Sequence, residues 1–348
     1  MNLRAWIFIV FVVCAQAQTE TRSYISWNDL RLDGGSATLE NGGDPTKLIV
    51  VSQNGTGDSL TVQGAIDLVP ENNTHRVKIY VHPGIYREKV HIPANKPYIT
   101  LIGDEDKANE TVITWHDKAG DKTADGGFLG TWNSASVTVL SDYMCATSIT
   151  FENTVIVKAD LGVNGYQAVA LRIAGKHAMF YRVRFLGSQD TLLDQDGSHY
   201  FLECFIQGTT DFIFGRATSL YKDCNISVVG DGFAIAAHHR DSPLDQTGFS
   251  FLNCTVRGTG HVFLGRAWGT YSRIIYSYTD FDIDVRPQGW QDWGIPSRRS
   301  TAVFGLYECR GRGAQRNTTQ DWSKAMNISE AMPFLHTAFI QGDQWLKL

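Results

Sequence analysis

One short pattern returns four times in the middle of the chain: Phe180-Tyr-Arg-Val-Arg-Phe185, Phe201-Leu-Glu-Cys-Phe-Ile206, Leu220-Tyr-Lys-Asp-Cys-Asn-Ile226 and Phe251-Leu-Asn-Cys-Thr-Val256. Val183, Cys204, Cys224 and Cys254 occupy equivalent places, separated by 21, 20 and 30 residues. A strand with turns that returns at this period is typical of a solenoid whose coils stack through parallel strands. The pattern therefore predicts a right-handed parallel β-helix, with these four side chains in an inward-facing row.

The sequence around this repeat is also rich in strands. Short β-rich runs at residues 48–51, 77–81, 98–102 and 136–140 are cut by Gly, Asn or Asp. Helical periodicity is nearly absent, and the best helix candidate runs from Leu60 to Leu68, with Asp58 or Ser59 as N-cap. A sandwich of hairpins would need Asn-Gly or Asp-Gly turns about every 8–12 residues, and that signal is weak. The expected fold class is all-β, as a single-domain solenoid.

Composition and the N-terminus limit the partners and the compartment. The 348 residues carry a net charge of −5 without a basic run, which argues against a nucleic-acid partner. Residues 1–17 combine Arg4, a short apolar run and Ala15-Gln-Ala17, which predicts a secretory signal rather than a membrane anchor. No later segment is apolar enough to cross a membrane. We expect a polar, Gly-rich arm at 18–46 and the β-helix domain at 47–348.

Two residue types bear on secretion. Seven Asn-x-Ser/Thr acceptors support an extracellular protein: Asn54, Asn72, Asn109, Asn225, Asn253, Asn317 and Asn327. Beyond the signal there are five cysteines, an odd number, so at least one stays unpaired. Cys224 and Cys254, equivalent in the repeat, are the first candidates for a disulfide, which the sequence leaves open.

Counting coils brings four polar residues together. Gln167 precedes Gln189 by 22 residues and Asp190 precedes Asp211 by 21, so each pair falls on adjacent coils about 4.8 Å apart. A ladder of polar side chains that satisfies backbone groups at turns is the simpler alternative. Two close carboxyl groups cannot both ionise cheaply, so one should keep its proton, above all beside a cation. Arg266 is a candidate for that cation, although coil counting alone does not place it.

Five segments carry a resemblance to a known family: Gly84-Ile-Tyr-Arg-Glu88, Tyr166-Gln-Ala-Val-Ala-Leu171, Gln189-Asp-Thr-Leu192, Asp211-Phe-Ile-Phe-Gly215 and Leu264-Gly-Arg-Ala-Trp268. Their order resembles that of plant pectin methylesterases (pectinesterases, carbohydrate esterase family 8), over roughly residues 45 to 340. The resemblance implies a right-handed parallel β-helix with loops that form a substrate cleft. It also implies hydrolysis of galacturonate methyl esters in pectin without a metal or a cofactor.

The resemblance also implies a role for each polar residue. Asp211 corresponds to the nucleophile that attacks the ester carbonyl. Asp190 corresponds to the acid that protonates methanol and then to the base that activates water. Gln167 and Gln189 correspond to the amide donors that stabilise the oxyanion. Arg266 corresponds to the residue that orients the nucleophile and keeps it ionised.

Four aromatic residues match positions that line the family's cleft, where rings pack on sugar faces: Trp268, Trp290, Trp132 and Phe214. The sugar-facing role is favoured most for Trp268 and Trp290, against the alternative of core packing. The charged stretch 238–240 could approach a uronate, although a solvated loop is the preferred interpretation. Glu88 is expected to support the fold.

Three departures from the family pattern stand near these residues. Ala267 replaces a proline, Leu193 a tyrosine and Arg216 an asparagine. None removes a proposed catalytic group, so activity is expected. The short segment before residue 47 resembles the family type without an inhibitor-like pro-region.

Two alternatives remain open from the sequence. One is another pectin-acting β-helix enzyme, a polygalacturonase or a lyase. The other is a wall-binding homologue that has lost turnover. The expected partners are pectin and a proteinaceous pectinesterase inhibitor, and the protein is expected to be a secreted monomer of the cell wall.

Overall fold

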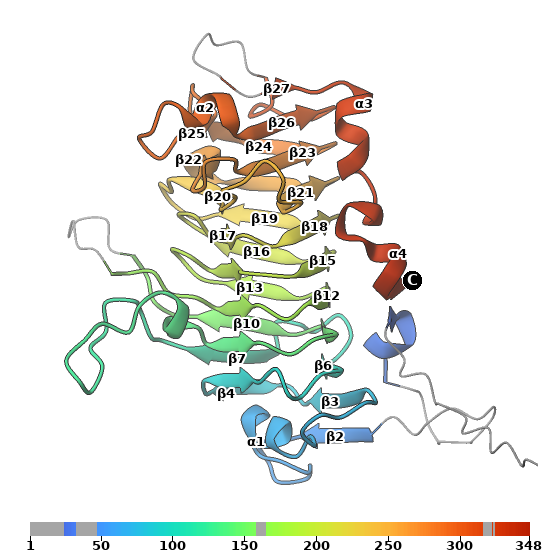
Figure 1. Cartoon of the computed structure of the whole chain (residues 1–348). Helices are drawn as coiled ribbons and strands as arrows, with labels where there is room; N and C mark the ends of the chain where they lie inside the picture. Colours follow the sequence, from blue (N-terminus) through green and yellow to red (C-terminus); the bar gives the residue numbers. More distant parts are fainter. Residues whose placement is uncertain (1–23, 33–46, 158–164, 316–321, 323) are drawn as a thin grey trace, which may run out of the picture.

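The chain winds into a long parallel β-helix, seen in the computed structural model from β2 at one end to β27 at the other (Figure 1). The structure describes residues 24–32, 47–157, 165–315, 322 and 324–348. The predicted signal at 1–17 and the acceptor Asn317 lie outside them. Each coil contributes one strand to each of three sheets, and every pairing between these strands is parallel. This is the predicted right-handed parallel β-helix.

The three sheets are built as follows. The first sheet has the order β2 (Lys47–Val51), β3 (Val77–Val81), β6 (Ile99–Ile102), β9 (Met144–Thr147), β12 (His177–Tyr181), β15 (Ser198–Leu202), β18 (Thr218–Lys222), β21 (Gly248–Leu252), β23 (Arg273–Ser277), β26 (Val303–Tyr307) and β27 (Lys324–Ala325). The second comprises β4 (Gly84–Arg87), β7 (Thr111–Trp115), β10 (Thr150–Asn153), β13 (Arg184–Leu186), β16 (Phe205–Gly208), β19 (Asn225–Val228), the start of β22 (Thr255–Ala267) and β24 (Asp280–Val285). The third comprises β5 (Val90–Ile92), β8 (Val137–Val139), β11 (Leu171–Ile173), β14 (Leu192–Asp194), β17 (Ile213–Gly215), β20 (Ala234–His238), the end of β22 and β25 (Trp290–Gln291). The 13-residue strand β22 therefore joins the second and third sheets.

The repeat sets the core as predicted. The inward row of Val183, Cys204, Cys224 and Cys254 is at most 1% exposed. One position ahead of each stands a residue with positive φ, namely Arg182, Glu203, Asp223 and Asn253, and this left-handed residue turns the chain from the first sheet into the second. Inside, rings of successive coils stack with centroids 4.5–4.9 Å apart: Phe180, Phe201, Tyr221, Phe251 and Tyr276.

The structure does not contain the candidate disulfide between Cys224 and Cys254. Cys145, Cys204, Cys224, Cys254 and Cys309 are all free thiols, so Cys224 and Cys254 are not bridged. The thiols of Cys204, Cys224 and Cys254 instead donate to carbonyl oxygens of the preceding coil. Burial raises the pKa of Cys224 and of Cys254 well above 9.0, so both stay protonated.

Helices are short and lie at the ends or on the outside. Those in the described part of the chain are α1 (Val62–Asp67), α2 (Arg298–Thr301), α3 (Ile328–Ala331), α4 (Gly342–Trp345) and the 3₁₀ turns η1 (Trp27–Leu30), η2 (Trp132–Ser134), η4 (Met332–Phe334) and η5 (Thr337–Ile340). Helix α1 falls within the predicted segment but has Thr61 as its N-cap. Glu88 accepts hydrogen bonds from the Val62 and Gln63 amides at 2.8 and 2.9 Å, so its expected structural role is confirmed.

Part of the predicted polar arm at 18–46 is folded and packs against the β-helix. Strand β1 (Ile25–Ser26) pairs with β28 (Leu346–Lys347), and Ile25 and Leu30 are buried against the first sheet. Buried Asp29 forms an ion pair with Arg76 at 3.3 Å. The sequence does not predict this docking, because the apolar side chains span only a single 3₁₀ turn. A segment that short shows no hydrophobic periodicity. The rest of the predicted arm lies outside the described residues.

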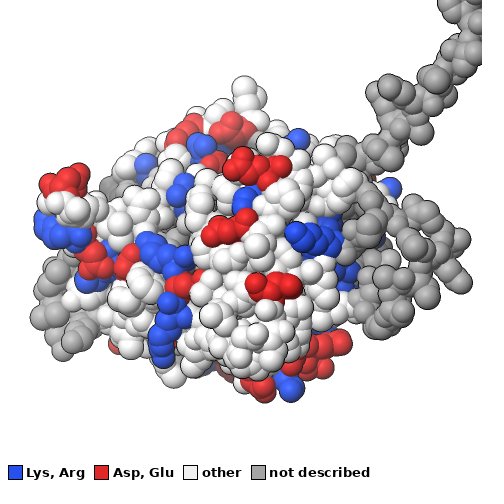
Figure 2. Space-filling model, turned by 90° about the horizontal axis from the view of Figure 1, so that it is seen from below, with Lys and Arg blue, Asp and Glu red and all other residues white. Residues whose placement is uncertain are grey.

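The surface carries both charge signs. At the end of the solenoid next to β2, Lys and Arg side chains lie interspersed with Asp and Glu (Figure 2). No helix within the described part of the chain is long and apolar enough to cross a lipid bilayer.

Candidate active site

Asp190 and Asp211 occupy the same turn on adjacent coils. Strands β14 and β17 pair with Leu192 opposite Ile213, so the two aspartates, each two residues earlier, stand side by side. The Asp190 amide donates to the Thr210 carbonyl at 3.0 Å. Both aspartates are in the left-handed region, with φ of 64° and 48°. Their adjacency, predicted by coil counting, is confirmed.

The packing beneath the turn explains the neighbouring sequence. A Cβ at Gly208 would lie 2.2 Å from the Cβ of Phe212, so only glycine lets the Phe212 ring enter the core directly after Asp211. The buried Thr191 hydroxyl donates to the Gln207 carbonyl at 2.9 Å and ties the Asp190 turn to the next coil. The two carboxyl groups are therefore held by a rigid frame.

The structure places Arg266, which coil counting could not. Its Nη1 donates to Asp211 Oδ2 at 2.7 Å, and its Nε donates to Gln291 Oε1 at 3.0 Å. The other Asp211 oxygen, Oδ1, is buried without a hydrogen-bond partner among the described residues. A buried carboxylate oxygen in that state is costly unless a ligand or a neighbouring proton satisfies it.

The two aspartates differ electrostatically. Burial raises the pKa of Asp190 well above 3.8, and repulsion from Asp211 adds to the rise while Arg266 opposes it. Burial also raises the pKa of Asp211, but Arg266 opposes that rise through its charge and its hydrogen bond. Asp211 is therefore the residue that ionises first, and Asp190 is the one that keeps its proton.

Gln189 and Gln167 lie beside the aspartate pair, on the coil of Asp190 and on the coil before it. Gln189 directly precedes Asp190, and its carbonyl accepts from the Ala168 amide at 3.1 Å. Gln167 thus stands one residue before the position opposite Gln189, a slight offset from strict register. Both side chains are half-buried, and neither amide group hydrogen-bonds to another described residue.

Trp268 lies beside the arginine, in a line of rings. Its ring stacks with Trp293 at a centroid distance of 6.5 Å, and it meets Phe214 at 6.2 Å. Trp293, which the sequence analysis missed, covers the Arg266 guanidinium at 3.6 Å. The only signal in the sequence was a second tryptophan three residues after Trp290. In the structure the Trp293 side chain has an exposed fraction of 36%.

The structure contradicts the predicted sugar-facing role of Trp290. It is only 1% exposed and stacks in the core on Phe304 at 4.5 Å, so its ring is not available to a sugar. Strand β25 pairs with β22 so that Trp290 stands opposite Gly265, which has room for the indole. The alternative of core packing holds for this residue.

The remaining predicted contacts divide between surface and core. Trp132 is 48% exposed on the excursion between β7 and β8, whereas Phe214 is 5% exposed in a small cluster outside the main core. The stretch 238–240 is not a solvated loop. His238 is fully buried and burial lowers its pKa to about 3, while buried Arg240 donates to three backbone carbonyls.

The three departures from the family pattern leave the acid pair intact. Ala267 is buried and its carbonyl accepts from Arg298 at 2.8 Å. Leu193 packs with Phe214 in the same small cluster. Arg216 is an exposed side chain that forms an ion pair with Asp196.

A buried polar group that the sequence analysis missed lies behind β14. Asp194 points into the core and accepts from the Tyr221 hydroxyl at 2.7 Å and contacts His199 Nδ1 at 2.5 Å. His199 Nε2 lies 2.9 Å from the Gly175 carbonyl and therefore donates to it. This network fixes the strand that follows Asp190.

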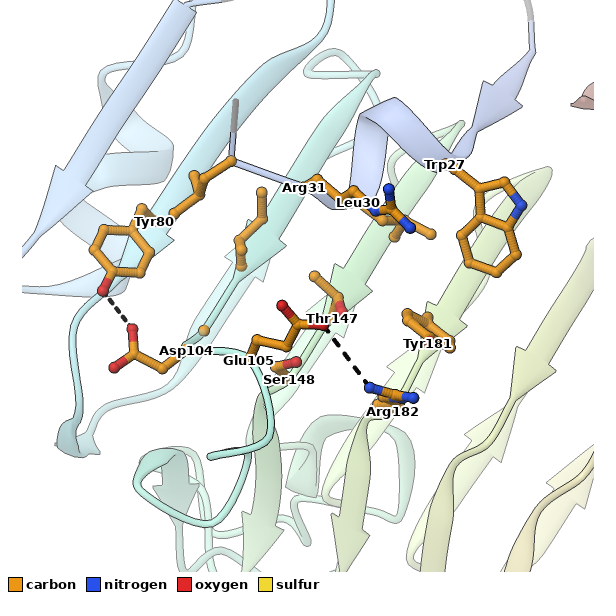
Figure 3. Close-up of a pocket in the computed structure, with 13 residues that line it drawn as sticks. Trp27, Leu30, Arg31, Tyr80, Asp104, Glu105, Thr147, Ser148, Tyr181 and Arg182 are labelled. Atoms are coloured by element: carbon orange, nitrogen blue, oxygen red, sulfur yellow. Dashed lines mark hydrogen bonds and ion pairs between the residues drawn. The ribbon is translucent and has the colours of Figure 1, made fainter. Parts of the chain in front are cut away.

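Two cavities indent the surface of the β-helix. One of about 420 Å³ borders the site, because Phe233 and Gln291 line it and both contact Arg266. Another of about 290 Å³ lies on the first sheet, beneath η1 (Figure 3). In it the Tyr80 hydroxyl donates to Asp104. Neither Asp190 nor Asp211 lines either of the two cavities. Among the described residues, no three His, Cys, Asp or Glu side chains are grouped to bind a metal ion.

The fold and the site define a β-helix protein with the groups of a carboxyl-dependent hydrolase, namely one buried carboxyl group with a raised pKa beside one carboxyl group paired with arginine. The chain belongs to the pectinesterase family, because the family model described as Pectinesterase matches residues 48–343. It is 53% identical to pectinesterase QRT1 of Arabidopsis thaliana, over 94% of this chain and 91% of that protein.

Solved structures of pectin methylesterases share this fold. Pectin methylesterase from carrot superposes with a TM-score of 0.76 at 32% identity, covering 88% of this chain and 96% of that one. The deglycosylated pectin methylesterase from Aspergillus niger superposes with a TM-score of 0.72 at 27% identity, covering 88% and 98%. The predicted family is confirmed.

Proposed function

We propose that the chain hydrolyses galacturonate methyl esters in pectin and releases methanol and de-esterified pectin. Membership of the pectinesterase family supports a carboxylic ester hydrolase. The observation that carries the mechanism is the ion pair between Asp211 and Arg266 beside Asp190, whose pKa is raised by burial.

In the first half of the reaction, the Asp211 carboxylate attacks the ester carbonyl carbon and forms a tetrahedral oxyanion. The free amides of Gln167 and Gln189 donate to this oxyanion, and one such donor is typically worth about 10²–10³ in rate. The bond to the methoxy oxygen then breaks, and Asp190 gives its proton to the leaving methanol. The product is an acyl-enzyme anhydride on Asp211.

In the second half, water hydrolyses the anhydride. Asp190, now ionised, takes a proton from the water as its oxygen attacks the acyl carbon. The galacturonate leaves as a carboxylic acid, Asp211 is again a carboxylate paired with Arg266, and Asp190 again holds a proton. Trp268 and Trp132 offer exposed or half-exposed rings for sugar faces beside this centre.

We also propose that the protein acts outside the cell, in the wall. Six of the seven glycosylation acceptors lie in the described part of the chain and all six are exposed: Asn54, Asn72, Asn109, Asn225, Asn253 and Asn327. A proteinaceous inhibitor as partner and a monomeric state remain expectations of the family resemblance.

The test is methanol release from methylated pectin by the purified mature chain, beside its Asp190→Asn and Asp211→Asn variants. Wild type should release methanol with or without a chelator and without shortening the polymer, and both variants should be nearly inactive. Shortened or unsaturated products would replace this proposal with a polygalacturonase or a lyase. Methanol release that survives in Asp211→Asn would refute the proposed nucleophile.

A further inference from the structure

The outer face of the third sheet carries an arginine on each side of an apolar surface. The strand register aligns one residue per coil in the order Arg172, Leu193, Phe214, Ala237 and Arg266. The middle three residues are at most 5% exposed and belong to a cluster outside the main core. An apolar platform thus runs past the acid pair, with Arg172 at its N-terminal end.

The two arginines differ in what neutralises them. Arg266 is paired with Asp211. Arg172 forms no ion pair with any described carboxylate. Asp196, the carboxylate whose charge acts on Arg172, is already paired with Arg216, whose Nε lies 2.5 Å from its Oδ1. The positive charge of Arg172 is therefore left for something outside the protein.

Arg172 is nevertheless held in place. Its Nε donates to Gln195 Oε1 at 2.7 Å, and its guanidinium carbon lies 5.1 Å from the centre of the Trp132 ring. Gln195 is fixed in turn by donating to Asp196 Oδ2 at 2.8 Å. The two terminal nitrogens donate to no described residue, so they form a fork of the shape that binds a carboxylate in bidentate fashion.

Holding this cation is costly. Partial burial lowers the pKa of Arg172 below its ordinary value, and the charge of Asp196 opposes the shift. A partly desolvated charge without a counter-ion destabilises the folded protein unless a ligand completes it. Exposed Trp132, which lies against the same guanidinium, adds an apolar surface suited to a sugar ring.

We propose that Arg172 binds the free carboxylate of a non-esterified uronate that neighbours the reacting ester on the N-terminal side of the site. Trp132 packs on the ring of that same sugar. The inference rests on the proposed function and deepens it, because the platform suits a neutral methyl ester while Arg172 suits an anion. The protein then distinguishes the esterification state of a neighbour from that of the residue it attacks.

The test compares two substrates, highly methyl-esterified pectin and pectin partly de-esterified at random by alkali. In Arg172→Gln, kcat/KM should fall about tenfold to a hundredfold more on the partly de-esterified substrate, as expected for a charge-assisted hydrogen bond. Arg172→Lys, which keeps the charge but not the fork, should lose less. The advantage in kcat/KM that wild type gains from Arg172 on the partly de-esterified pectin should decrease as salt is added. The control Arg257→Gln removes an exposed arginine on the start of β22, away from the platform, and should change neither value.

Binding of trigalacturonate, followed by calorimetry, gives a readout without turnover. Arg172→Gln should weaken it by a similar factor, and Arg257→Gln should not. Equal losses on both pectins, or unchanged trigalacturonate binding, would overturn the role of Arg172. Absence of methanol release by wild type would instead refute the proposed function, while the binding measurement would still decide on Arg172.

Discussion

Replacement of Arg266 by glutamine tests how the site keeps its nucleophile ionised. The ion pair is short, with 2.7 Å between Nη1 and Asp211 Oδ2, and both side chains are mostly buried. A hydrogen bond between charged partners contributes about 1.5–3 kcal/mol. Since about 1.36 kcal/mol corresponds to a tenfold change in rate, Arg266→Gln should lower kcat/KM about 10- to 150-fold near neutral pH.

The sign of the pH effect follows from the charges. Arg266 lowers the pKa of Asp211 by its charge and its hydrogen bond, and it lowers that of Asp190 by its charge alone. Without it both pKa values rise. The acidic limb of the pH–rate profile, which reports the ionisation of Asp211, should move to higher pH, and the alkaline limb of Asp190 should follow by less.

The assay is methanol release across the pH range, as kcat/KM, with Arg266→Lys and Arg312→Gln beside the glutamine variant. Lysine keeps the charge and should move the acidic limb less. Arg312 forms only exposed ion pairs with Asp282 and Asp284, so its loss should leave the profile in place. An acidic limb that does not move in Arg266→Gln would show that Arg266 does not control Asp211.

Four further substitutions separate chemistry, strand support, core packing and sugar contact. Asp190→Asn should lower methanol release about 10²–10⁴-fold, the usual contribution of a general acid or base. Because the pKa of Asp190 is raised on folding, wild type loses stability as pH rises through that folded value, and the Asn variant should not; thermal unfolding at several pH values measures this. Tyr221→Phe should lower stability by about 1–3 kcal/mol, since Asp194 Oδ2 loses its hydroxyl donor in the core, and a matching denaturant midpoint would be the evidence. Trp290→Ala should cost about 3–5 kcal/mol of stability as a core truncation, whereas Trp268→Ala should mainly raise KM, about two- to tenfold; the reverse pattern would restore the sugar-facing role of Trp290.

The sequence predicted those features that depend on the period of the coil. Val183 and Cys204 face inward, and Asp190 and Asp211 stand side by side, because coils of 21 and 20 residues keep their register. Arg266 could not be placed in this way. Its coil pairs Ala236 with Gly265, so an extra stretch of chain lies between the coils and counting from the repeat fails.

Side-chain orientation was the other limit. Trp290 and Trp293 are three residues apart in similar sequence, yet one enters the core and the other covers Arg266. The difference depends on the two-residue strand β25 and on the space at Gly265 in a distant strand. A pattern of residues along one segment does not contain that information.

The order of the coils explains why the two aspartates take different roles. On its N-terminal side Asp190 has Val169 opposite, and on its C-terminal side it has Asp211, so its neighbours are one apolar side chain and one anion. On its C-terminal side Asp211 has Ala234, a small residue that leaves room for Arg266 to reach across from the following coil. The cation therefore meets Asp211 first, and the asymmetry that acid–base chemistry requires arises from the position of each aspartate in the stack, although the two turns have the same conformation.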